Sequence, residues 1–310
     1  MDVSEAIDDQ TIHLAIAFDK NYLQPFYALA CSIGKNNTGA FHIHAITTGI
    51  SNETRNAIVI YLRKYSGEIT FYDIDVAGAE QFVLMNNWTS AVYYRLYFPQ
   101  IVPTAIRRLL YLDTDMLVIN GLQELYNIDL EGYPIAAVYD NYVKTQPLIG
   151  IYEEEQYFNS GMMVIDTDRW RSQSISERTM EYLRQYPERI KFVDQCGLNA
   201  ILKNNWKKLP GKYNLLFSLI PEGLSKRAIQ VFLRDKVVVH FTLQRPWNML
   251  CKNRLRYLYF YYLRQSPGRY LNKYTDFSIN KIPAWIKIRL VEFYFDHTAI
   301  QKIWRKFHMR

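Results

Sequence analysis

Two aspartates one residue apart are the part of this chain whose types and spacing best predict chemistry. Asp113 and Asp115 interrupt an apolar run that extends from Arg107 to Asn120. The flanks predict one buried strand, in which residues i and i+2 project to the same side. Two carboxylates in apolar surroundings are costly unless a cation neutralises them. The pair therefore predicts a site for Mn²⁺ or Mg²⁺, although two solvated carboxylates at a strand end would give the same pattern.

The segments that must position this pair alternate between apolar runs and helical spacing. We expect strands at 11–18, 41–47 and 69–74, with helices at 25–33 and 53–65 between them. This order predicts a mainly parallel sheet with helices on both faces. Such sheets bind ligands beyond the carboxyl ends of their strands, where Asp19 and Asp113 fall. Further strands are expected at 135–139, 161–165 and 237–241.

The composition is that of a globular protein. The 310 residues are 49% hydrophobic and 22% charged, and no apolar stretch has the length of a transmembrane helix. The acidic first residues are unlike a secretory leader. Three cysteines, Cys31, Cys196 and Cys251, form no disulfide or metal framework. We expect a cytoplasmic protein.

Charge is concentrated near the C-terminus. From Lys252 to Arg310 there are 13 Lys and Arg residues against three acids, a net charge of +10, together with 14 aromatic residues. The preceding 251 residues carry −3. We therefore expect a main domain over 1–250 and a basic, aromatic-rich helical region over 251–310. Residues 257–263 are expected to pack on the main domain, whereas 282–295 and 298–309 resemble helices that lie on an anionic membrane. Nucleic-acid binding is the alternative for this region.

Several segments, taken together with the aspartate pair, resemble family 8 glycosyltransferases over roughly residues 12–270. In pattern they are most similar to bacterial lipooligosaccharide galactosyltransferases. The segments are 17–22, 94–96, 157–166, 193–199 and 239–247. The resemblance implies a GT-A fold, Mn²⁺ or Mg²⁺, and a UDP-galactose or UDP-glucose donor. It also implies retention of the sugar's configuration and transfer of a hexose to a hydroxyl of a surface-glycan precursor such as lipopolysaccharide or lipooligosaccharide. Such an acceptor would place the protein on the inner face of the membrane.

The same resemblance implies roles for individual residues. The metal ligands would be Asp113, Asp115 and His240. The donor nucleotide and diphosphate would contact Ala17, Phe18, Asp19, Asn21, Tyr22, Arg95, Thr114 and Arg245 as well as the two aspartates. The candidate catalytic residues around the sugar are Asp140, Asn159, Asp194 and Gln195. A nearby carboxylate or amide oxygen assists an oxocarbenium-like sugar. Because the Gln195 amide is neutral, we expect attack from the leaving-group side without a covalent intermediate.

One segment departs from the family pattern His-x-x-Gly-x-x-Lys-Pro-Trp. Here it is His240-Phe-Thr-Leu243-Gln-Arg245-Pro-Trp247, so the glycine is replaced, one residue is missing and lysine has become arginine. A non-catalytic binder of sugar nucleotides or glycans on the same fold is therefore one alternative. A haloacid-dehalogenase-like phosphohydrolase is another, but it does not account for the segments of Asn159, Asp194 and His240. Taken singly, His240, Asn159 and Gln195 could also be structural residues.

Overall fold

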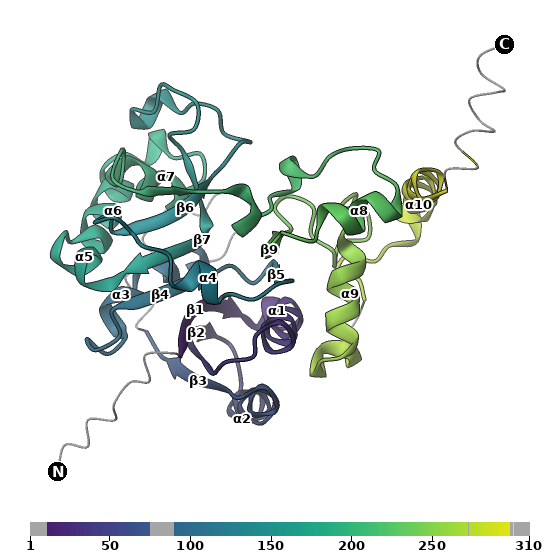
Figure 1. Cartoon of the computed structure of the whole chain (residues 1–310), viewed down its shortest axis with the longest axis horizontal. Coiled ribbons are helices and arrows are strands. Elements are labelled where there is room, and N and C mark those ends of the chain that lie inside the picture. Colours follow the sequence, from purple (N-terminus) through teal and green to yellow (C-terminus); the bar gives the residue numbers. More distant parts are fainter. Residues whose placement is uncertain (1–10, 75–89, 272, 298–299, 301–310) are drawn as a thin grey trace.

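The computed structural model describes residues 11–74, 90–271, 273–297 and 300, and its centre is a seven-stranded sheet (Figure 1). Its first half is parallel, with β3 (Gly67–Tyr72), β2 (Phe41–Thr48) and β1 (Ile12–Asp19) side by side. The connecting helices α1 (Leu23–Asn36) and α2 (Asn52–Leu62) lie between these strands in sequence. The predicted β-α-β-α-β order is confirmed.

The second half of the sheet is mixed. Parallel to β1 lies β4 (Arg108–Leu112), followed by β7 (Phe158–Asp166), which is antiparallel to both β4 and β6 (Ile135–Tyr139). The last strand, β8 (Lys207–Leu209), is parallel to β6. The β6–β7 register shifts so that Ala137 faces Met163 while the next residue, Val138, faces Asn159. Residues 160–162 are thereby left out of the β6 ladder, an irregularity that redirects side chains.

The predicted single strand through the aspartate pair is wrong. The strand β4 ends at Leu112, a turn contains Asp115, and β5 (Met116–Val118) pairs antiparallel with β9 (Val238–His240) in a separate two-stranded ribbon. The backbone hydrogen bonds explain the break. The amide of Asp113 still bonds the carbonyl of Gly161 in the main sheet (2.8 Å), whereas the carbonyl of Asp115 accepts from Phe241 beyond the ribbon (2.9 Å).

Two hydrophobic cores lie on the two faces of the sheet. Leu14, Ile16 and Phe18 belong to the core shared with α1, whereas Ala15 and Ile46 belong to the core on the other face. There Trp170 is fully buried, and Asp166 caps its helix by accepting a hydrogen bond from the amide of Arg169 (2.9 Å). The other helices are α3 (Phe98–Ile101), α4 (Gln123–Tyr126), α5 (Thr167–Ser172), α6 (Ile175–Gln185), α7 (Val193–Ile201), α8 (Lys226–Phe232), α9 (Arg256–Arg264) and α10 (Ile282–Asp296).

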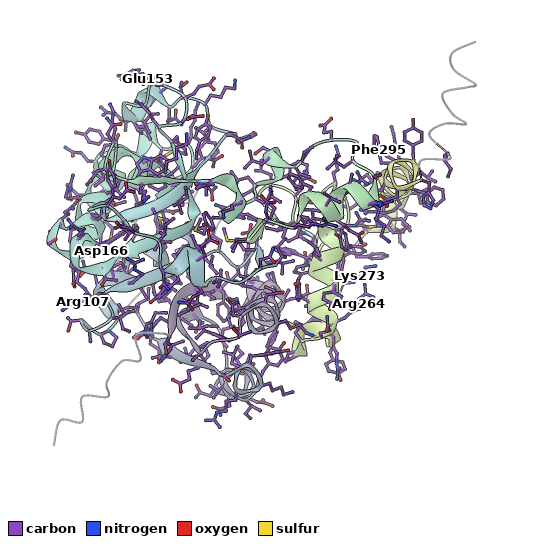
Figure 2. The ribbon with its side chains drawn as sticks, in the orientation of Figure 1. Arg107, Glu153, Asp166, Arg264, Lys273 and Phe295 are labelled. Atoms are coloured by element: carbon purple, nitrogen blue, oxygen red, sulfur yellow. The ribbon has the colours of Figure 1, made fainter. Side chains whose placement is uncertain are left out.

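The C-terminal helices differ in how they attach. Tyr259 and Leu263 of α9 are buried, and Tyr262 accepts a hydrogen bond from Asn36 of α1 (2.9 Å), which confirms the expected packing of 257–263. Helix α10 lies farther from the sheet than α9 and carries Phe295 near its end (Figure 2). No helix in the described ranges is long and apolar enough to span a membrane. The acidic start of the chain and the predicted helix at 298–309, except Ile300, lie outside the described residues.

Candidate active site

Three predicted metal ligands converge where the sheet meets the ribbon. One ligand atom each from Asp113, Asp115 and His240 lies within 4.8 Å of the others. Asp113 follows β4 and Asp115 precedes β5, while His240 ends β9 opposite Met116. The Nε2 atom of His240 is 3.1 Å from Oδ1 of Asp115. Two carboxylates and an imidazole are a donor set that suits a divalent cation and leaves further coordination positions for a ligand.

The backbone beside this cluster leaves room only for glycine. A Cβ atom on Gly161 would lie 2.5 Å from Cε1 of His240 and 2.7 Å from Oδ2 of Asp113. Both contacts are closer than real Cβ atoms approach other atoms. The space that glycine leaves is filled by the two ligand side chains. The residues present therefore fit a metal at this position.

The two aspartates have different electrostatic surroundings. Burial raises the pKa of Asp113, although Arg95 opposes the shift and the hydroxyl of Tyr111 donates a hydrogen bond to Oδ1 (2.7 Å). Burial also acts to raise the pKa of Asp115, but His240 and Arg245 outweigh it, so that the pKa of Asp115 is lowered. A carboxylate held ionised next to an imidazole is ready to bind a cation.

Arg95 lies between two buried carboxylates. Its guanidinium pairs with Asp113 at 3.0 Å and, through Nε, with Asp194 at 2.8 Å. Its Nη1 donates to the carbonyl oxygen of Ser160 (2.7 Å) and to its hydroxyl oxygen (2.9 Å). Burial raises the pKa of Asp194 to about 6, although Arg95 acts to lower it. Arg95 thus links the metal ligands to the predicted catalytic residues, and these contacts are all with protein groups.

The four predicted catalytic residues form one hydrogen-bonded network. The Nε2 atom of Gln195 donates to Asp140 (3.0 Å), and the Nδ2 atom of Asn159 donates to the same carboxylate oxygen (3.1 Å). The amide oxygen of Gln195 accepts from the backbone amide of Ser160 (3.1 Å) and from Asn159 (3.3 Å). Asp194 accepts from the hydroxyl of Ser160 (3.4 Å). Both the amide nitrogen and the amide oxygen of Gln195 are therefore held in place by hydrogen bonds.

The first residue of helix α7 has a strained backbone conformation. The two residues that follow it, Asp194 and Gln195, belong to this network. Val193, a β-branched residue, has φ +39°, in the left-handed region that such residues rarely adopt. One turn later Asn199 clamps α7 to β7 through two hydrogen bonds to the backbone of Phe158 (2.8 and 2.9 Å). Cys196 is buried, and burial raises the pKa of its thiol, in agreement with the structural role expected for it.

The structure adds one residue that the sequence analysis missed. Asn214 is fully buried, accepts a hydrogen bond from Nδ1 of His240 (3.1 Å), and donates one to the amide oxygen of Asn159 (3.0 Å). It connects the candidate metal ligands to the network of predicted catalytic residues. The segment around Asn214 has no motif and no periodic pattern, so only its spatial position identifies it. Tyr111 and Ser160 lie inside segments that the sequence analysis singled out, but only their spatial positions show which site residues they contact.

The predicted nucleotide-binding residues surround the end of β1. The Oδ1 atom of Asp19 accepts from the backbone amides of Asn21 (2.8 Å) and Tyr22 (3.2 Å) and so shapes the turn after the strand. Asn21 is exposed and Ala17 half-buried, whereas the Phe18 side chain is in the core, stacked on Phe26. The Phe18 side chain therefore does not face a ligand.

Tyr22 lies between this region and segment 240–247, the segment that departs from the family pattern. Its ring lies 5.6 Å from the guanidinium carbon of Arg245 and makes an edge contact with Trp247 at 5.9 Å. Burial raises the pKa of Tyr22 to about 12, although Arg245 acts to lower it. The phenol therefore stays protonated at neutral pH and can donate a hydrogen bond. Thr114, between the two aspartates, is buried.

At Leu243, where the family pattern has glycine, the backbone keeps a conformation typical of glycine. Leu243 has φ +62° and a side chain that is 65% exposed. This left-handed conformation is one that glycine adopts readily and leucine rarely does. The loop after His240 therefore follows a glycine-type path, with an added side chain that points into solvent.

The fold and the site together define a GT-A type α/β protein with an Asp-x-Asp and histidine cluster at the sheet edge. The family described as "Glycosyl transferase family 8" matches residues 13–275. The chain belongs to this family and is a glycosyltransferase. This membership removes the phosphohydrolase alternative.

Individual relatives agree with this assignment. General stress protein A of Bacillus subtilis is 29% identical over 268 residues, which cover 82% of this chain and 94% of the relative. The lipopolysaccharide 1,3-galactosyltransferase of Salmonella typhimurium is 27% identical, with 78% of this chain and 74% of the relative covered. Among solved structures, the galactosyltransferase LgtC with donor and acceptor sugar analogues has a TM-score of 0.72 at 23% identity, covering 88% of this chain and all of that one. At this level of identity, the similarity to LgtC is evidence for the fold only.

Proposed function

We propose that this protein is a retaining, metal-dependent hexosyltransferase that moves galactose or glucose from a UDP-sugar to a hydroxyl of a cell-surface glycan precursor such as lipopolysaccharide or lipooligosaccharide. The observation that carries the proposal is the convergence of Asp113, Asp115 and His240 within 4.8 Å, connected through Arg95 and Asn214 to the network of Gln195. The relatives that act on lipopolysaccharide support the acceptor class.

In this proposal the cluster binds the donor's diphosphate through Mn²⁺ or Mg²⁺, which when bound neutralises the charge that develops on the leaving group. Arg245, half-buried beside Tyr22, adds a positive charge on the nucleotide side. Arg95 keeps Asp113 and Asp194 from repelling each other, which holds both carboxylates in place. Asp140 and Asn159 orient the amide of Gln195 beside the sugar.

Retention of the sugar's configuration, which the family resemblance implies, requires either a protein nucleophile or attack from the leaving-group side. The amide oxygen of Gln195 is neutral and already accepts hydrogen bonds from Asn159 and Ser160, so it is a poor nucleophile. We infer that the acceptor hydroxyl attacks from the side of the leaving diphosphate, whose oxygen takes up the proton. A glycosylated Asp194 or Gln195 detected by mass spectrometry would contradict this inference.

The test of the proposed function is UDP release from a panel of UDP-sugars, with Mn²⁺ and with EDTA. We expect slow hydrolysis of one donor that needs Mn²⁺ and is lost in Asp115→Asn. The matched control is Asp129→Asn, which removes an exposed carboxylate that bonds the backbone of Glu131 away from the cluster. No release from any donor, together with no thermal stabilisation by UDP and Mn²⁺, would favour the non-catalytic binder.

The same proposal includes attachment to an anionic membrane through α10 on the cytoplasmic side. The helix is held to the protein by its charged side, through ion pairs of Arg254 with Asp296 and of Arg256 with Glu292. Its exposed residues include Ile286, Leu290 and Phe293, spaced by four and three residues along the helix. A helix that docks by charges and presents an apolar row to the outside suits the interface of a bilayer that holds a lipid-linked acceptor.

Liposome flotation tests this attachment with two matched variants. Leu290 on α10 and Ile60 on α2 are both 63% exposed. We expect Leu290→Glu to lower the recovery with anionic liposomes and Ile60→Glu to leave it unchanged. Equal recovery of both variants and of the unaltered protein would contradict membrane binding through α10.

A further inference from the structure

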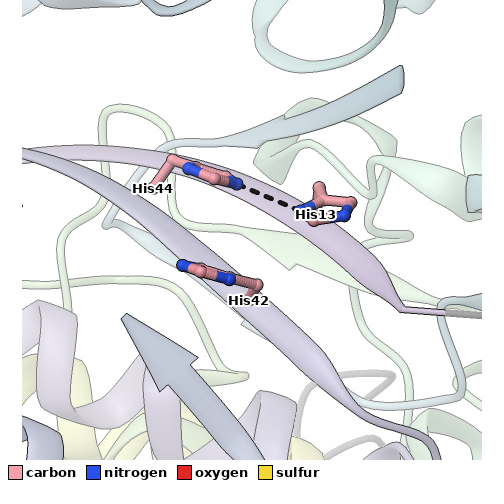
Figure 3. A group of neighbouring side chains, drawn as sticks. All are labelled: His13, His42 and His44. Carbon is pink, nitrogen blue, oxygen red and sulfur yellow. Dashed lines mark hydrogen bonds between the residues drawn. The ribbon is translucent and has the colours of Figure 1, made fainter. Parts of the chain in front are cut away.

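Three histidines lie together at the end of the sheet that is remote from the candidate active site (Figure 3). His13 is near the start of β1 and faces His42 of β2 in the strand register, and His44 is two residues further along β2. The three imidazoles therefore project from the same face of two paired strands. Along β1, His13 is six residues from Asp19, a distance of about 20 Å. The group is thus separate from the cluster of Asp113, Asp115 and His240.

The geometry already brings the ring nitrogens close together. One nitrogen from each ring lies within 4.8 Å of the others, and Nδ1 of His13 is 3.1 Å from Nε2 of His44. The rings of His42 and His44 are stacked, with centroids 4.6 Å apart and planes inclined by 4°. His13 and His44 are buried and His42 is half-buried. In the described part of the chain, Nε2 of His13 is buried without a hydrogen-bond partner.

The protonation state of the group favours coordination. Burial lowers the pKa of His13 to about 4 and that of His44 to about 3, and neighbouring imidazoles add to both shifts. Burial also lowers the pKa of His42, although Glu68 opposes the shift. The rings are therefore neutral near pH 7, which is the form in which histidine binds metals.

We propose that His13, His42 and His44 bind Zn²⁺, with the carboxylate of Glu68 as the fourth ligand. The 3.1 Å between the nitrogens of His13 and His44 suits two ligands of one ion at bond lengths of about 2.0–2.1 Å. Glu68 is the register partner of His42 on β3, and its Oε2 lies 3.6 Å from Nδ1 of that ring. Three nitrogens and one oxygen form a closed tetrahedral site of the structural kind.

Binding requires two partly or fully exposed side chains, His42 and Glu68, to move. A metal lies in the plane of each ligating ring, so the stacked His42 must turn away from His44 and release the hydroxyl of Thr70, which is now 2.8 Å from its Nε2. His42 is the partly exposed member of the group and Glu68 is 78% exposed, so both have space to turn. The ion would fasten β1, β2 and β3 together. The nitrogen-rich ligand set also distinguishes this site from the oxygen-rich active-site cluster.

The test measures Zn²⁺ binding to the full-length protein by calorimetry and by metal analysis after dialysis. The Asp115→Asn background weakens the active-site cluster, so that binding to the histidines is measured separately from the proposed transferase. We expect one Zn²⁺ per chain in that background. His42→Gln should lower the affinity by at least about tenfold, because loss of a ligand costs no less than loss of an outer partner. His297→Gln, at an exposed histidine at the end of α10, should change nothing.

Two further measurements do not depend on how well a histidine variant folds. Zn²⁺ should raise the melting temperature of the Asp115→Asn protein, because a metal that binds only the native state stabilises it. Co²⁺ in place of Zn²⁺ should give the visible absorption of a tetrahedral site. No bound Zn²⁺, or the same affinity in His42→Gln as in its parent, would overturn the proposal. The result leaves the UDP-release experiment unaffected.

Discussion

His240 and Asn214 are joined by a hydrogen bond of 3.1 Å between Nδ1 of the imidazole and Oδ1 of the buried amide. Because the amide oxygen can only accept, Nδ1 carries a proton toward Asn214, and Nε2 is the ring nitrogen that faces Asp115 (3.1 Å). The backbone enforces this pairing, since Leu215 bonds to Val238 and His240 bonds back to Leu215. Asn214 therefore sets the tautomer of a residue 26 positions away.

This relationship makes Asn214→Leu the sharpest test of how the metal cluster is organised. The substitution keeps the branched shape of the side chain, with two methyl groups in place of the amide atoms, but leaves Nδ1 of His240 and the amide oxygen of Asn159 without this partner. We expect Mn²⁺ affinity to fall about 10–100-fold, as is usual for loss of an outer partner of a metal ligand. Direct Mn²⁺ titration by electron paramagnetic resonance measures it without relying on turnover. Asn214→Asp, which can still accept from His240, should lose less.

The matched control for this change is Asn205→Leu. Asn205 is half-buried and bonds the side chain of Gln173 (2.9 Å), outside the residues of the metal cluster. It should leave Mn²⁺ affinity unchanged. Equal Mn²⁺ affinity in Asn214→Leu and in the unaltered protein would show that Asn214 does not position His240.

Gly161→Ala should disable the metal cluster by steric overlap. The new methyl group would lie 2.5 Å from His240 and 2.7 Å from Asp113, so at least one of these side chains must move. We expect Mn²⁺ affinity to fall at least about tenfold and stability to fall by roughly 1–3 kcal/mol from overpacking. Gly39→Ala is the control, because a Cβ atom there would meet no atom within 4 Å. Unaltered Mn²⁺ affinity in the Gly161→Ala protein would refute this explanation.

Leu243→Gly should stabilise the protein. A leucine at φ +62° costs roughly 1–3 kcal/mol of backbone strain, whereas the flexibility of glycine in the unfolded chain costs about 0.5–1 kcal/mol. We expect a net gain of about 1 kcal/mol, measured by chemical denaturation. Leu243→Val should have the opposite effect, because a β-branched residue tolerates this conformation least. A less stable glycine variant would mean that the exposed leucine side chain contributes packing that outweighs its strain.

Asp194 should make the free energy of unfolding depend on pH in a defined window. Its pKa is raised from 3.8 to about 6 in the native state. Between these values the native state binds more protons than the unfolded state, so this group's contribution to the free energy of unfolding falls as pH rises. Asp194→Asn removes the effect. The free energy of unfolding of the variant, relative to the unaltered protein, should rise from about pH 4 to about pH 6 and stay constant above about pH 7.

Denaturation at several pH values across this window measures the difference. Asp168→Asn, at a more exposed carboxylate paired with Arg107 and Arg171, serves as the control for the general acid sensitivity of the protein. A difference between Asp194→Asn and the unaltered protein that is independent of pH would contradict the raised pKa of Asp194.

The sequence alone was sufficient for the parts of the protein that depend on local pattern. The alternation of apolar runs and helical spacing predicted β1 through β3 and their helices, because a buried parallel strand needs a continuous apolar run. The order of the motifs predicted the family. Asp113, Asp115 and His240 could be proposed as metal ligands because carboxylate and imidazole side chains commonly bind divalent cations.

Tertiary structure decided whatever depends on contacts between distant segments. The run through Asp113 reads as one strand, yet its second half bonds β9, because hydrogen-bonding partners rather than hydrophobicity determine where a strand ends. Asn214 has no sequence signal, and its role, like that of Tyr111, comes only from the atoms that it faces. The residue type of Leu243 shows only that the glycine of the family pattern is replaced. Its φ angle shows that the backbone conformation typical of glycine is kept. Local pattern determines which elements form, and packing determines which side chains meet.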